Sequence, residues 1–110
     1  MDASLGSLEL AALLAVARLG DDAYGLAVRR DVSAQAAYDY SVGAIYTTLQ
    51  RLEDKGFIAS RHSDPLPIRG GRSRRQFRLT AAGRKAIQLA QRRATAAWAG
   101  IDGALRPRST

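Results

Sequence analysis

The sequence of 110 residues contains no cysteine, which excludes both a disulfide framework and a metal site built from thiolates. A chain without cysteine suits a reducing compartment, and we expect a cytoplasmic protein. The sequence also has only one histidine, His62. A lone histidine has no partners for a metal site or a catalytic array. We therefore expect no enzyme, no metal and no cofactor.

The N-terminal stretch lacks the basic start of a signal peptide and carries Glu9 among its apolar residues. A membrane-spanning helix needs about 20 consecutive apolar residues, so we expect no contact with a membrane.

Acidic residues are scarce in the second half of the chain. Residues 1–60 hold five basic and eight acidic side chains, giving −3, whereas residues 61–110 hold twelve and two, giving +10. A positive charge confined to one half implies an anionic partner, most simply nucleic acid. Arginine supplies 15 of the 17 basic residues. Its planar group suits phosphates and narrow grooves, although genomic base composition would give the same bias.

Residues 41–55 form the clearest predicted helix. Ser41 can cap its start and Gly56 can end it in a left-handed conformation. One stripe of apolar residues predicts the buried face: Ile45, Leu49 and Leu52. Polar side chains are expected off that stripe: Thr47, Thr48, Gln50 and Arg51. This arrangement is typical of a helix that reads bases in the major groove, although an amphipathic surface helix would show the same pattern.

Two further helices precede it, so the order is that of a helix-turn-helix. The first, residues 5–19, is apolar nearly all round, which indicates a core helix or one shared with a second subunit. Ser4 or Ser7 is its expected cap. The second is expected from residue 23 to 34 or 37, with Asp22 as cap. Gly25 inside it indicates close packing.

Residues 57–61 and 75–79 are predicted strands on either side of a loop rich in proline and glycine. Several arginines fall on the loop and second strand: Arg69, Arg72, Arg74, Arg75 and Arg78. A basic hairpin directly after a helix-turn-helix is a wing that can reach phosphates or the minor groove. A solvated flexible loop is the alternative.

The last predicted helix begins after Thr80 and runs to about residue 104. Its seam alternates two sets seven residues apart: Ile87, Ala94 and Ile101 with Gln91, Trp98 and Leu105. Such a seam favours dimerisation. The predicted fold is therefore mainly α with a small β-hairpin. Residues 1–80 would form a winged helix-turn-helix domain, and residues 81–110 a dimerisation helix with a basic tail.

These motifs resemble the PadR-like transcriptional regulators, in their short form with one C-terminal dimerisation helix. The matching segments are Ala23-Tyr24-Gly25, residues 43–56 and residues 74–83. The resemblance implies a dimeric winged helix-turn-helix repressor that binds a pseudo-palindromic operator, with Tyr46 and its neighbours at the DNA. The chain departs from the family pattern at Asp22, where proline is usual, and at Leu26, where an aromatic residue is common. The family's inducer class is therefore not carried over.

Three sets of site residues follow. The expected DNA contacts are Ser41, Tyr46, Thr47, Thr48, Arg51, Arg72, Arg74 and Arg75. The expected dimer interface comprises Leu5, Leu8, Ile87, Ala94, Trp98, Ile101 and Leu105. A pocket for a small aromatic effector would be lined by Tyr38, Tyr40 and Trp98. The leading function is a sequence-specific dimeric repressor, released by a small molecule or another signal, that binds an inverted repeat in double-stranded DNA. The alternative is a ligand-sensing or protein-interaction module whose DNA binding is secondary.

Overall fold

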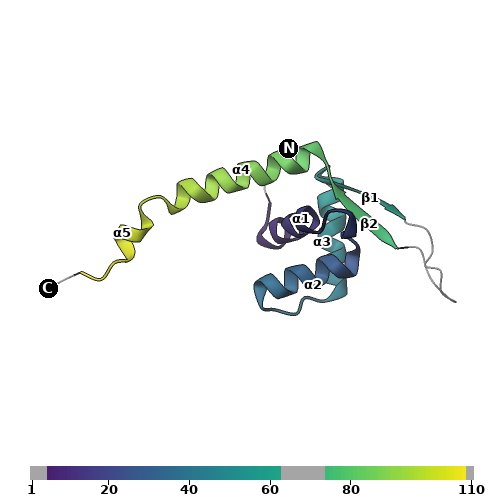
Figure 1. The fold of residues 1–110 in the computed structure, drawn as a ribbon, viewed down its shortest axis with the longest axis horizontal. Coiled ribbons are helices and arrows are strands. Elements are labelled where there is room, and N and C mark those ends of the chain that lie inside the picture. Colours follow the sequence, from purple (N-terminus) through teal and green to yellow (C-terminus); the bar gives the residue numbers. More distant parts are fainter. Residues whose placement is uncertain (1–4, 63–73, 109–110) are drawn as a thin grey trace.

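The computed structural model describes residues 5–62 and 74–108 (Figure 1). The chain is mainly helical with one small hairpin, which confirms the predicted fold class. The elements in order are α1 (Ser7–Leu19), the 3-10 turn η1 (Gly20–Asp22), α2 (Gly25–Ala36), α3 (Val42–Asp54), β1 (Ile58–His62), β2 (Arg75–Leu79), α4 (Ala81–Trp98) and α5 (Ile101–Leu105).

The ends of α3 are those that the sequence predicts. The Ala44 N–H donates to the Ser41 hydroxyl oxygen at 3.1 Å. Gly56 takes a φ of 81°, which the absence of a side chain permits. Gly20 likewise ends α1 with a φ of 56°.

The predicted starts of α1 and α2 are wrong. Helix α1 is capped at Gly6, whose N–H donates to the Glu9 carboxylate at 3.0 Å, and not at Ser4 or Ser7. Helix α2 is capped at Tyr24 and not at Asp22. The start of α2 is displaced by contact with the wing. The Phe77 N–H donates to the Ala23 carbonyl at 2.8 Å, and Tyr24 forms a β-bridge with Gln76. Residues 23–24 are held against β2 and cannot enter the helix.

The core surrounds α1, which packs on α2, α3, β2 and α4. The predicted stripe of α3 is fully buried there. The other large buried side chains are Leu13 and Val16 of α1, Val28 and Val32 of α2, Ile58 of β1 and Phe77 of β2. This arrangement confirms that α1 is buried on more than one side.

The hairpin pairs β1 and β2 antiparallel, from Ile58 opposite Leu79 to His62 opposite Arg75. Phe77 points inward and is fully buried, as its alternation with polar neighbours predicts. Beyond β2, the Gly83 N–H donates to the Thr80 hydroxyl at 3.0 Å, so Thr80 caps α4 as expected.

Helix α4 leaves the body as a long arm, which gives the molecule its 70 Å dimension (Figure 1). It ends at Trp98, so the expected continuous helix to residue 104 is wrong. Ala99 is extended and Gly100 has a φ of 78°, because glycine favours this left-handed conformation over a helix interior. Ile101 and Leu105 therefore lie on the separate helix α5, and the seam of three heptads is interrupted.

Within residues 5–62 and 74–108, none of the helices combines the length and hydropathy needed to cross a membrane.

Candidate nucleic-acid interface

The polar face of α3 lies opposite its buried stripe. Thr47 and Gln50 are exposed there, and Gly43 has open space beside it. Thr48 is different, because its side chain is only 5% exposed and its hydroxyl donates to the Ala44 carbonyl at 2.8 Å. The expectation that Thr48 lies off the buried stripe is therefore wrong. Its hydroxyl is turned back onto the helix backbone and is not presented for DNA contact.

Tyr46 lies on the flank of α3 that faces the start of α2. Its phenol lies against Gly25, where a methyl group on the glycine would be only 2.1 Å from the hydroxyl oxygen. This contact confirms the expected close packing at Gly25. It also holds the half-buried ring at the border between α2 and α3, with one side open to solvent.

A groove of about 700 Å³ runs between the start of α2, the start of α3 and the base of the wing. Its apolar and aromatic lining residues are Tyr24, Leu26, Val42 and Tyr46. Its rim is basic, with Arg30, Arg74, Arg75 and His62, and the residues that line it include no carboxylate. The Arg74 guanidinium lies 4.0 Å above the centre of the Tyr24 ring. A groove of this charge beside the polar face of α3 suits a phosphate backbone. Arg30 and His62 also line it, although neither was among the expected DNA contacts.

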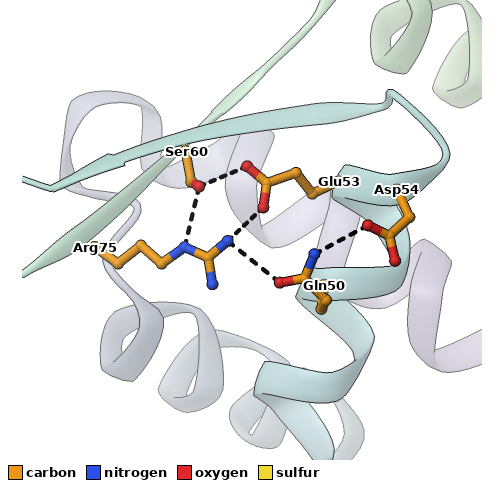
Figure 2. Close-up of polar contacts among 5 residues, drawn as sticks. All are labelled: Gln50, Glu53, Asp54, Ser60 and Arg75. Atoms are coloured by element: carbon orange, nitrogen blue, oxygen red, sulfur yellow. Dashed lines mark hydrogen bonds and ion pairs between the residues drawn. The ribbon is translucent and has the colours of Figure 1, made fainter.

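Arg75 is engaged inside the protein and not free at the surface (Figure 2). Its guanidinium forms an ion pair with Glu53, donates to the Ser60 hydroxyl at 3.0 Å and approaches the Gln50 carbonyl oxygen at 3.4 Å. Glu53 is half-buried in this pair. The contacts join the wing to the second half of α3.

Arg51 is exposed on the flank of α3 that faces the start of α1. Near it, the Lys55 ammonium lies 2.7 Å from the Glu9 carboxylate. Burial of Glu9 raises the pKa of its carboxyl, but the hydrogen bonds from Lys55 and Gly6 and the charges of Lys55 and Arg51 together lower it below the ordinary 4.5. Arg51 thus contributes to the field around Glu9 and lies at the edge of the polar face.

The remaining arginines of the wing differ in whether they are described and in their contacts. Arg72, expected at DNA, and Arg69 fall outside the described residues. Arg78 is exposed on β2, and the Arg61 Nε donates to the Gln76 amide oxygen at 2.9 Å.

The residues expected at a dimer interface fall into two groups. Leu5, Leu8 and Ile87 are partly buried against the core of their own chain. Ala94, Trp98 and Leu105 lie exposed on the arm, where Trp98 is 69% exposed. An apolar groove of about 480 Å³ opens between α1 and α4, lined in part by Leu5, Leu10, Ala86 and Leu89. Leu10 of α1 was not among the expected interface residues, and Leu89 lies on a different face of α4 from the expected seam.

The expected effector residues do not meet within one copy of the described chain. Tyr38 and Tyr40 contact each other edge to face, with ring centres 4.7 Å apart. Trp98 lines a shallow hollow with Ala97, Ile101 and Leu105, all from the C-terminal arm. In the described part of the chain, no three histidine or acidic side chains gather closely enough to hold a metal ion.

Comparisons with protein families and with solved structures find similar proteins. A sequence model of the transcriptional regulator PadR-like family matches residues 13–89. A PadR family transcription regulator from a hypervirulent Clostridium difficile strain has a similar structure, with a TM-score of 0.65, 21% identity and coverage of 91% of this chain and 95% of that one. A transcriptional regulator from Clostridium thermocellum gives a TM-score of 0.70 at 18% identity, covering 94% and 100% of the two chains. RosR of H. salinarum gives 0.70 at 19% identity, covering 89% and 81%. No curated protein sequence matches the chain.

Proposed function

The chain belongs to the PadR-like family of transcriptional regulators, and on this premise we propose that it is a dimeric repressor that binds an inverted repeat. The family consists of DNA-binding regulators and not of enzymes. Membership of this family makes the chain a DNA-binding transcriptional regulator. The proposal adds that the chain forms a dimer, binds a symmetric operator, represses transcription and is released by a signal. Binding to the chromosome would place the protein at the nucleoid.

The observation that carries the proposal is the position of the polar face of α3 beside a basic groove. Thr47 and Gln50 project from that face, while Arg30 and Arg74 border the groove next to it. A helix in the major groove needs base-reading side chains on its exposed face, with cations beside it for the flanking phosphates. Ser41 is exposed at the start of α3, and its hydroxyl hydrogen remains available for a phosphate because the oxygen serves as the acceptor in the cap.

The support for a dimer is the apolar groove between α1 and α4 together with the exposed arm. Leu89 is 39% exposed and Trp98 69% exposed, on a helix that projects from the body. A second copy that packs its α4 against this groove would cover Leu89, and the projecting arm would bring Trp98 against another part of the same partner. Two α3 helices about one turn of DNA apart (roughly 34–36 Å) would then match an inverted repeat.

The release signal that we propose is a small aromatic compound. Tyr38 is 64% exposed beside Tyr40, and Trp98 is exposed on the arm. A dimer in which the arm of one copy meets the tyrosines of the other would complete a pocket. Titration of the fluorescence of Trp98, the chain's only tryptophan, with planar aromatic compounds tests this part. A saturable change that weakens DNA binding is expected, and no saturable change would remove the effector from the proposal.

Genomic selection of bound DNA, carried out with purified protein at two salt concentrations, tests the main function. We expect recovery of a short inverted repeat, and loss of that selection when both Tyr46 and Thr47 are changed to alanine. If the recovered DNA shares no sequence motif and its affinity falls steeply with salt, the chain recognises only the charge of DNA. In that case a sensing or protein-interaction module becomes the better account.

A further inference from the structure

Arg75 is held in one plane by a closed ring of hydrogen bonds. Its Nε donates to Ser60 Oγ at 3.0 Å, Ser60 Oγ donates to Glu53 Oε1 at 2.5 Å, and Glu53 Oε2 accepts from an Arg75 amino group (Figure 2). The Arg75 and Glu53 side chains are 29% and 25% exposed, so the ring is partly shielded from solvent. The ring therefore fixes where the second donor of that amino group points.

Gln50 receives this donor. Its carbonyl oxygen Oε1 accepts from Arg75 at 3.4 Å, and its amide nitrogen Nε2 donates to Asp54 Oδ1 at 3.0 Å (Figure 2). The direction of the amide follows from the chemistry of its partners, because a guanidinium can only donate and a carboxylate can only accept. A half-turn of the amide would place donor against donor at Arg75 and acceptor against acceptor at Asp54. Gln50 thus has one defined orientation on the exposed face of α3.

One acceptor position on Oε1 and one hydrogen on Nε2 remain unused in this arrangement. Adenine presents the complementary pair in the major groove, a donor at N6 and an acceptor at N7, and glutamine binds both at once. We infer that Gln50 reads an adenine in each half-site, and that Arg75 and Asp54 are positioning residues that hold its amide in the reading orientation. This inference rests on the proposed function and names the residue that sets sequence preference.

The competing role for Arg75 is a plain phosphate contact, and two variants separate the roles. Arg75→Lys keeps the positive charge but cannot form the planar fork that closes the ring. Arg78→Ala removes an exposed cation from the same strand without touching the ring. A phosphate contact depends on charge and lowers affinity for all sequences alike. A positioning role depends on geometry and acts on one base.

The experiment is selection from a random DNA library followed by base preferences at each position, with dissociation constants measured over a range of salt. It compares the wild-type protein with Gln50→Ala, Gln50→Glu, Arg75→Lys and Arg78→Ala. Gln50 is exposed, so its variants should fold, and circular dichroism with thermal unfolding checks this. Gln50→Glu has nearly the same shape but no donor for adenine N7.

The wild type should prefer adenine at one position in each half-site. Both Gln50 variants should lose that preference and weaken binding to the selected site by roughly 5- to 140-fold, while other positions keep theirs. Arg75→Lys should weaken the preference for adenine at the same position. The slope of log affinity against log salt concentration should stay unchanged. Arg78→Ala should leave every preference intact.

Two results would overturn the inference while leaving the proposed function standing. The first is a wild-type motif that survives in full in both Gln50 variants. The second is an Arg75→Lys protein with the wild-type preference for that adenine. Failure of the proposed function itself looks different, because the wild type would then select no motif at all.

Discussion

The hydroxyl of Tyr46 fills the space that a side chain at Gly25 would need, since a methyl group there would lie 2.1 Å from its oxygen. The sequence places these residues 21 positions apart, and their contact brings α2 and α3 close together beside the basic groove.

Gly25→Ala should therefore destabilise the fold by about 1–3 kcal/mol, the usual cost of overpacking. It should also weaken DNA binding, because the Tyr46 ring must move. Gly43→Ala is the matched control, since open space surrounds Gly43 inside α3. That change should raise stability by up to about 1 kcal/mol through helix propensity. Urea unfolding measures both. A Gly25→Ala protein as stable as the wild type would show that the ring is not confined.

Thr47 and Thr48 are neighbours with opposite surroundings, and their variants should differ accordingly. Thr47→Ala removes an exposed hydroxyl from the polar face and should weaken operator binding by about 2- to 10-fold. Thr48→Val removes a hydroxyl that bonds only to the helix backbone, so operator affinity should stay unchanged. Its stability should change by no more than about 1.5 kcal/mol. Binding titrations on one operator fragment decide the matter. Equal losses from both variants would mean that Thr48 turns outward on DNA.

The Glu9–Lys55 pair predicts a loss of stability in acid. The pKa of Glu9 is lowered in the folded chain, so the unfolded chain binds the proton more readily. The contribution of Glu9 to the free energy of unfolding is therefore complete above pH 4.5 and is lost as the pH falls through the folded-state pKa. The difference in unfolding free energy between wild type and Glu9→Gln should be constant near neutral pH and shrink in acid. A difference that stays constant down to about pH 3 would contradict the pair.

Leu89→Glu should convert the dimer into a monomer, because it puts a charge into the apolar groove between α1 and α4. Trp98→Glu should act in the same direction from the exposed arm. Gln88→Glu introduces the same charge at the preceding residue, whose side chain does not line the groove. This control should leave the dimer intact. Sedimentation velocity of the three variants at matched concentrations measures the outcome. A dimer that tolerates Leu89→Glu would place the interface elsewhere.

The sequence predicted those features that depend on neighbours along the chain. The cap at Ser41, the left-handed Gly56, the buried stripe of α3 and the bounds of β2 are of this kind. Each is set by propensity, local hydrogen bonds or a simple period.

The features that were missed depend on partners distant in sequence. The ion pair of Arg75 with Glu53 was missed because its partners are 22 positions apart. Asp22 failed as a cap because the hydrogen bond from Phe77 of β2 holds Ala23 outside the helix. Thr48 stands at the edge of the apolar stripe, where only the packing of the neighbouring helices decides whether it is buried. The break at Gly100 has a local signal, glycine inside a helix, but the heptad pattern continues across it and favours an unbroken helix.

The most direct test of a dimer that reads DNA with α3 is hydroxyl-radical footprinting of the protein on its selected operator, combined with the mass of the complex. Such a dimer should place two chains of 11.8 kDa on each duplex and give two protected regions centred about 10–10.5 base pairs apart on one face of the DNA. A single chain per site, or uniform protection that extends with protein concentration, would contradict a dimer that reads successive major grooves with α3.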